Sequence, residues 1–225
     1  MTTQVQSPNY YAGLPASWNA QTYINQNLTG NAPDTSISGD LTQSGLIAES
    51  FAYNLGTTPV LMSTATSAGS VLGTQITLPV ESTVTNLWYD IAVAGGTLTA
   101  NDCWALLFNS SGTLIGQSAD QHTIWTTAGL GGSAAGGTAL TASATGSLSN
   151  LPAGNYYGAL VYTGTTAPTV SCLAVGSAEL ANINTSVANA NFRAAVLATG
   201  VTTTPASVTL TSATLSKYRL WMGVN

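Results

Sequence analysis

The clearest pattern in the chain is a pair of apolar segments between residues 84 and 120. In the first, VTNLWYDIAV, the side chains of Leu87, Tyr89 and Ile91 fall on one face, a period of two that predicts a β-strand with one buried face. The second, CWALLF, is apolar at every position, as in a strand buried between two layers. The turn formers NSSG and the strand-like TLI follow it, which predicts a hairpin. We therefore expect this stretch to lie at the centre of the core.

Similar strand-like segments recur with short spacing, bounded by Gly, Pro or Ser-Thr clusters, and no helix-length amphipathic segment is present. The expected strands lie near residues 46–53, 71–79, 84–94, 102–109, 113–118, 154–163, 168–175, 192–198 and 217–224. A glycine-rich loop over 128–149 should end in an edge strand near 138–145, and 178–190 could form a short helical turn. The pattern predicts an all-β fold, a two-sheet antiparallel β-sandwich of jelly-roll type. Its expected core includes Trp104, Leu106, Phe108, Leu160 and Leu220.

Residues 1–45 differ from the rest, so we expect two parts: an extended N-terminal arm at 1–45 and a sandwich domain at 46–225. Prolines break any helix in the arm and no period is sustained. The arm nevertheless contains large aromatic side chains, which anchor well when buried against a partner: Tyr10, Tyr11, Trp18 and Tyr23. These residues either pack on their own domain or lie on a neighbouring subunit, and we favour the neighbouring subunit.

Charge is scarce in this chain of 225 residues, since only 5% are Asp, Glu, Lys or Arg. The net charge is −5 with three basic residues, so there is no electrostatic footprint for nucleic acid or an anionic membrane. The start of the chain lacks the basic and apolar regions of a signal peptide, which predicts synthesis in a cytoplasm without secretion. Cys103 and Cys172 lie in separate strand patterns and could form a disulfide or stay as buried thiols; a reducing cytosol favours thiols.

Candidate catalytic chemistry is limited. His122 could form a Ser-His-Asp arrangement with Ser118 and Asp120, but no nucleophile-elbow motif supports it. Two carboxylates could form a glycosidase site, and the candidate acids are Glu81, Asp90, Asp102 and Asp120. The spacing of these acids in the sequence favours no particular pair. No metal-binding or dinucleotide motif is found. We expect a non-enzymatic protein without catalytic residues, cofactor or metal.

Two further hypotheses concern the surface. Trp88, Tyr89 and Trp125 are the aromatic residues that could form an exposed cluster for a glycan or host receptor. The chain has only three basic residues, Arg193, Lys217 and Arg219. We expect at least one of them to pair with an acid such as Asp90, Asp102 or Glu179.

Four segments give a resemblance to a known family. GTLTANDCWALLFNSSGTLIGQSADQHTIWTTAG (96–129), LPAGNYYGALVYTGTTAP (151–168), NFRAAVLATGVTTTPASVTL (191–210) and YRLWMGVN (218–225) resemble, in order and spacing, a β-sandwich module of virion proteins of phages that infect actinobacteria. The resemblance covers roughly residues 46–225. Residues 1–45 do not match the long tail proteins that often carry this module.

This resemblance implies a structural protein at the virion surface, a minor tail or capsid decoration protein docked by its arm. Its partners would be other virion proteins of the capsid or tail, and it would form a homo-oligomer, with a trimer as the first expectation. A glycan- or receptor-binding tail module involved in host attachment is the alternative, and a glycan-degrading enzyme is a more distant one.

Overall fold

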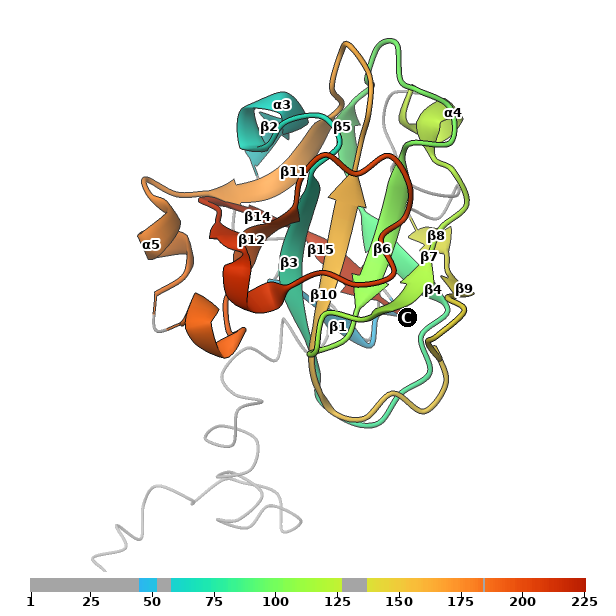
Figure 1. Cartoon of the computed structure of the whole chain (residues 1–225), viewed down its shortest axis with the longest axis vertical. Helices are drawn as coiled ribbons and strands as arrows, with labels where there is room; N and C mark the ends of the chain where they lie inside the picture. The colour runs from blue at the N-terminus through green and yellow to red at the C-terminus, as the bar shows by residue number, and fades with distance from the viewer. Residues whose placement is uncertain (1–44, 52–57, 127–136, 184) are drawn as a thin grey trace, which may run out of the picture. The chain divides into compact units, whose positions relative to one another are not determined.

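The computed structural model describes residues 45–51, 58–126, 137–183 and 185–225 (Figure 1). The strands are β1 (Ala48–Glu49), β2 (Thr58–Leu61), β3 (Val71–Leu78), β4 (Asn86–Tyr89), β5 (Ile91–Val93), β6 (Trp104–Phe108), β7 (Leu114–Gln117), β8 (Gly137–Ala139), β9 (Thr141–Ala142), β10 (Gly154–Val161), β11 (Thr169–Ala174), β12 (Ala194–Ala198), β13 (Thr214–Leu215), β14 (Tyr218–Leu220) and β15 (Met222–Val224). The helical turns are α3 (Met62–Ala65), α4 (His122–Trp125), α5 (Ala178–Ala181), η2 (Val187–Asn189) and η3 (Leu210–Ser212). Among these residues no helix is long and apolar enough to cross a membrane.

The described strands form three antiparallel sheets. The largest has seven strands in the order β13-β12-β3-β10-β6-β7-β9. A second has the order β1-β15-β4-β8, and the third has β14-β11-β2 with β5 also pairing with β11. The fold is thus an all-β sandwich of packed antiparallel sheets, as the sequence pattern predicted. The jelly-roll type stays a prediction.

The two smaller sheets join into one layer at Ser171 of β11. β4 and β5 are separated only by Asp90, and β14 and β15 only by Trp221. The Ser171 N–H donates to the Asp90 carbonyl (3.1 Å), and the Ser171 hydroxyl donates to the Asp90 carboxylate. The Ser171 carbonyl accepts the Trp221 N–H (3.1 Å). The chain therefore passes from one small sheet to the other at two places, Asp90 and Trp221, and both residues bond to Ser171.

The main core lies between this joined layer and the seven-stranded sheet. The seven-stranded sheet contributes Leu72, Ile76, Leu107 and Leu160, and the facing layer contributes Leu87, Tyr89, Val170, Leu220 and Met222. All of these side chains are buried because alternate positions of each strand point toward the other layer.

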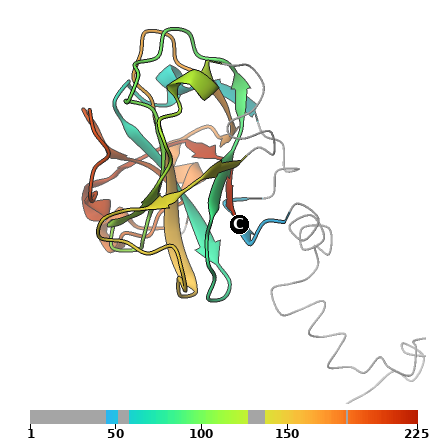
Figure 2. The ribbon, with the colours of Figure 1, turned by 90° about the vertical axis from the view of Figure 1, so that its right-hand side faces the viewer.

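A second core covers the opposite face of the seven-stranded sheet. Trp104, Leu106, Phe108 and Tyr157 point to this side, and the buried side chains that cover them are Phe192, Val208, Leu210 and Ala213. Most of that cover is residues 199–213, here called the strap, which crosses in front of β3, β10 and β6 in Figure 1. In Figure 2 the red strap and β15 lie on opposite sides of β10. Burial on both faces explains why CWALLF is apolar throughout, as predicted, and all five expected core residues are buried.

The strap is attached to turns of the sheet that it covers. The Val201 N–H donates to the Gly69 carbonyl (2.8 Å), and the Val208 N–H donates to the Gly112 carbonyl (2.8 Å). Gly112 has φ +82°, and a Cβ there would lie 2.1 Å from the Val208 carbonyl oxygen. Only glycine fits this turn, because any side chain would displace the strap.

Most of the expected strands are present, but in 46–53 only β1 is a strand among the described residues, and β2 and β13 lie outside the expected ranges. The predicted hairpin is β6–β7, the edge strand near 138–145 appears as β8 and β9, and the helical turn at 178–190 appears as α5 and η2. The segments 84–94 and 217–224, expected to be single strands, are each divided in two at the joint between the smaller sheets.

Candidate functional site

The three aromatic residues expected to form an exposed contact surface do not do so. Tyr89 is 2% exposed and Trp125 is 0% exposed. Their rings meet edge to face at 5.8 Å, and the Trp125 indole N–H donates to the Tyr89 hydroxyl (3.1 Å). Trp88 is half-buried, and its indole N–H donates to the side-chain oxygen of Asn225 (3.0 Å). The expectation was wrong because Tyr89 lies on the same core-facing side of β4 as Leu87, and because α4 directs Trp125 into the core.

Tyr89 and Trp125 belong to a buried polar network centred on Gln121. The Tyr89 hydroxyl donates to the Gln121 side-chain oxygen (3.0 Å), and the Gln121 side-chain amide donates to the Ala119 carbonyl (2.8 Å). The Gln121 N–H donates to the Cys103 carbonyl (2.8 Å). Burial raises the pKa of Tyr89 strongly, although the bond from Trp125 opposes this rise. Since its polar atoms find partners, the network fixes α4 against the start of β6.

A second polar cluster lies at the surface, at the beginning of α4. The Asp120 carboxylate bonds to Nδ1 of His122, and Nε2 of His122 lies 3.1 Å from the Thr123 hydroxyl. Burial would raise the pKa of Asp120, but the Asn101 N–H (2.6 Å) and the bonds from His122 outweigh it, so that this pKa is lowered. The carboxylate favours the tautomer of His122 with a proton on Nδ1, which leaves Nε2 to accept a proton from a hydroxyl.

Ser118, the hydroxyl that the sequence suggested as a partner of His122, is not in this cluster. It is buried, and its Oγ accepts the Ala105 N–H (3.0 Å). The hydroxyl next to Nε2 of His122 is that of Thr123, where Ser118 was expected. No signal in the sequence pointed to Thr123, because it directly follows His122 in the chain. The Asp-His-hydroxyl order is that of a nucleophilic triad. Here, however, Asp120 lies two residues before His122, and His122 and Thr123 are the first two residues of α4, so local geometry is sufficient to explain the contacts.

Of the acids named for a glycosidase pair, Asp90 and Asp120 accept hydrogen bonds from local partners. Asp90 accepts from Ser171, and Asp120 accepts from Asn101 and His122. Glu81 is exposed in the turn after β3. No hydrogen bond joins two of the carboxylates of Glu81, Asp90, Asp102 and Asp120 in the described ranges.

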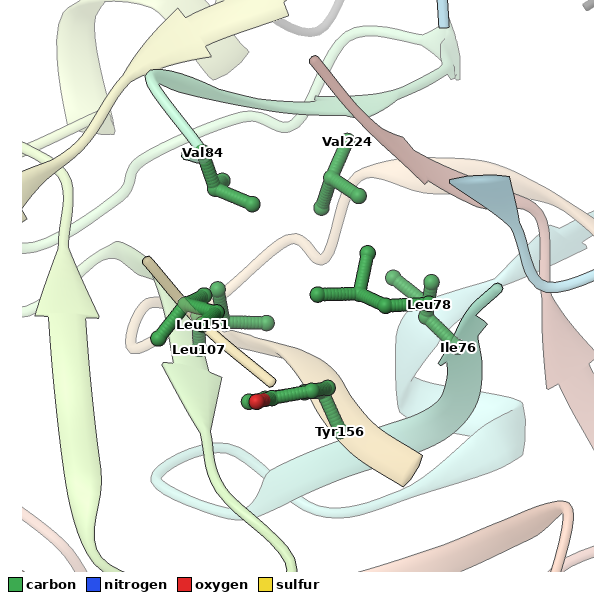
Figure 3. A pocket seen from close by; sticks show the side chains of 7 residues that line it. All are labelled: Ile76, Leu78, Val84, Leu107, Leu151, Tyr156 and Val224. Carbon is green, nitrogen blue, oxygen red and sulfur yellow. The ribbon is translucent and has the colours of Figure 1, made fainter. Parts of the chain in front are cut away.

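A narrow apolar gap lies at one end of the main core (Figure 3). It is lined by Ile76, Leu78, Val84, Leu107, Leu151, Tyr156 and Val224. None of these residues is more than 6% exposed. The Tyr156 hydroxyl donates to the Pro152 carbonyl (2.9 Å), so the polar atom of the lining already has a partner. We interpret this gap as part of the packing between the two layers.

The two cysteines are free and buried. Burial raises the pKa of each thiol to about 11. Of the two alternatives left open by the sequence, the structure contains buried thiols.

The basic residues bind carbonyl oxygens and aromatic rings. Arg219 donates to the Ser50 carbonyl and lies 5.4 Å from the Phe51 ring centroid. Arg193 donates to the Ile183 carbonyl, and the Lys217 ammonium lies 5.1 Å from the centroid of an adjacent tyrosine ring. None of them pairs with the acids named from the sequence, Asp90, Asp102 and Glu179, in the part of the chain that the structure describes.

The expected arm anchors Tyr10, Tyr11, Trp18 and Tyr23 lie outside the described residues. Comparison with known proteins found no match to this chain among family models, curated proteins or solved structures.

Proposed function

We propose that this chain is a non-enzymatic structural protein of a phage particle, a minor tail or capsid decoration protein. In this proposal the sandwich is displayed at the virion surface, and the N-terminal arm, residues 1–45, docks it to the particle. Its partners are other virion proteins and further copies of itself, with a trimer as the first expectation.

The observation on which the proposal rests is where the four segments of the resemblance lie in the fold. Segment 96–129 contains β6, β7 and α4, and 151–168 contains β10. Segment 191–210 contains β12 and most of the strap, and 218–225 contains β14 and β15. These elements belong to the seven-stranded sheet, to the strap that covers one of its faces, and to the layer formed by the two smaller sheets. The resemblance thus involves residues that determine the sandwich itself, which supports a common module.

The low charge of the surface also supports a subunit that works in many copies. Like charges on neighbouring subunits repel one another, and this cost increases with the net charge of each copy. This chain has 3 basic and 8 acidic residues, so copies can lie close together at little electrostatic cost. A surface with so few charges also favours association over colloidal repulsion.

The alternative, a glycan- or receptor-binding module, is less well supported. Carbohydrate recognition uses aromatic faces that are open to the ligand. Tyr89 and Trp125, two of the three candidate residues, are in the core.

The proposal can be tested by locating the protein on purified particles. Gold-labelled antibody raised against the full chain should mark the same position on every virion in electron micrographs. Particles from a phage lacking the gene serve as the control. Protein that stays in the soluble lysate, with no label above the control, would reject the proposal.

A further inference from the structure

One surface of the sandwich combines exposed apolar side chains with basic ones. Leu180 of α5 is 61% exposed, and Ile183, just after it, is 58% exposed. Arg193 and Lys217 belong to the segments that pack beside α5. We call these four residues the α5 patch. The third basic residue of the chain, Arg219, is close enough to Arg193 for repulsion between them to contribute to its lowered pKa, after the larger effect of burial.

The patch is held in place by a buried asparagine. The side-chain amide of Asn182 donates to the carbonyls of Ala178 (2.8 Å) and Ser216 (3.0 Å). Its side-chain oxygen accepts the N–H groups of Arg193 (2.8 Å) and Ala194 (2.9 Å). Asn182 therefore ties α5 to the start of β12 and to the residue before Lys217. A surface fixed in this way loses little conformational entropy when a partner binds.

The basic side chains of the α5 patch form no ion pair with a carboxylate of the described residues. Arg193 bonds to a carbonyl and Lys217 lies over a ring, and neither has a carboxylate among its described partners. The acid on α5 itself, Glu179, is exposed in the first turn of that helix. Two of the three lysine and arginine residues of a chain with net charge −5 belong to this patch. Such a surface is complementary to an acidic segment that also carries apolar side chains.

The sequence contains such a segment. Residues 1–44 include Asp34 and Asp40 and no lysine, arginine or histidine. Ile37 lies midway between the two acids. In an extended chain, six residues span roughly 20 Å at about 3.3 Å per residue. An isoleucine between two acids thus offers both kinds of side chain that would complement a basic and apolar surface.

We propose that the α5 patch binds residues 31–44 of a second copy of this chain. Asp34 and Asp40 of one copy face Arg193 and Lys217 of the other, and Ile37 covers Leu180 and Ile183. The inference rests on the proposed docking role of the arm and names the surface that receives it between copies.

Two full-length variants with complementary charge reversals test this contact. Lys217→Glu alters the patch, and the double substitution Asp34→Lys with Asp40→Lys alters the arm. In sedimentation velocity at low salt, each variant alone should associate about tenfold more weakly than the wild type. An equimolar mixture should recover association, because the unchanged arm of the first variant fits the unchanged patch of the second.

The mixture distinguishes contacts between copies from contacts within one chain. If the mixture stays as dissociated as the single variants, or if the wild type is itself a monomer at micromolar concentration, the proposal is overturned. Leu180→Ser should also weaken association, whereas Val80→Ser should not. Val80 is the matched control because it is 60% exposed in the turn after β3. Circular dichroism checks that each variant is folded.

The outcome is separable from the test of the virion role. Gold label on the particle together with failed complementation rejects the α5 patch as the receiving surface and leaves the structural role intact. Absence of the label rejects the structural role whatever the variants do.

Discussion

Leu106 is fully buried in β6, on the side of the central sheet that the strap covers. Leu106→Ala should lower the free energy of unfolding by about 2–5 kcal/mol, because it removes buried methyl groups and leaves a cavity. Urea denaturation followed by tryptophan fluorescence measures this loss. The exposed control Val80→Ala should change stability by no more than about 0.5 kcal/mol. A loss below about 1 kcal/mol for Leu106→Ala would mean that the strap does not seal this face.

Cys103 and Cys172 should be inert toward thiol reagents in the native protein. Both side chains are buried, and the thiolate that reacts is disfavoured because burial raises the pKa of each to about 11. With a chromogenic disulfide reagent at pH 8, both thiols should react only after urea is added. Rapid reaction of either thiol in the folded protein, or failure of both to react in urea, contradicts the assignment of two buried free thiols.

The raised pKa values of Cys103 and Cys172 predict that the folded protein loses stability at alkaline pH. The folded thiols keep their protons up to a pKa of about 11, whereas the ordinary value is 9.0. Between these values the unfolded chain binds fewer protons than the folded one, so the free energy of unfolding falls as pH rises from 9 to about 11. Urea denaturation at several pH values should show this fall. In a variant with Cys103→Ala and Cys172→Ala the slope should be smaller, and an unchanged slope would assign the effect to other groups.

At the scale of elements, the joint at Ser171 connects two sheets into one layer. Ser171→Ala removes the donor to the Asp90 carboxylate inside this joint. The expected loss of stability is about 1–3 kcal/mol, since a partly buried acceptor is left without its partner. Ser110→Ala, in the exposed turn after β6, is the control in the same urea assay. Equal effects of the two substitutions would show that the joint does not depend on the hydroxyl.

Sequence patterns could place the strands because alternation of apolar residues reports which face of a strand is buried. Alternation does not report which sheet a strand belongs to, so the divisions at Asp90 and Trp221 were not predictable from it. The apolar run CWALLF correctly indicated two covering layers. The strap itself has no period, because Val208, Leu210 and Ala213 reach the sheet from an irregular backbone.

The candidate site was less predictable than the fold. Tyr89 could have been assigned to the core from its own alternation with Leu87 and Ile91. Trp125 could not, because its burial depends on the short helix α4 and on the bonds to Tyr89 and Gln121. The α5 patch could not be read from sequence either, since Leu180, Arg193 and Lys217 are far apart in the chain and are brought together by the folded structure, in which Asn182 joins their segments.

At the scale of the whole molecule, the proposed function assigns separate tasks to the sandwich and the arm. Both described cores are formed by residues after 45, and the first backbone bond of the joined layer runs from the Ile47 N–H to the Val224 carbonyl (2.8 Å). Removing residues 1–45 should therefore leave these contacts in place. The arm would contribute docking, in which burial of anchors such as Tyr10 and Trp18 offsets the entropy lost on ordering.

The most direct test measures incorporation of the protein into phage particles with and without residues 1–45. Particles assembled with either form are purified, and the copy number per particle is determined by quantitative immunoblotting. Unfolding in urea verifies that the truncated sandwich is folded. We predict that the truncated protein keeps the wild-type unfolding midpoint and is absent from the particle. Incorporation at wild-type copy number would contradict the docking role of the arm.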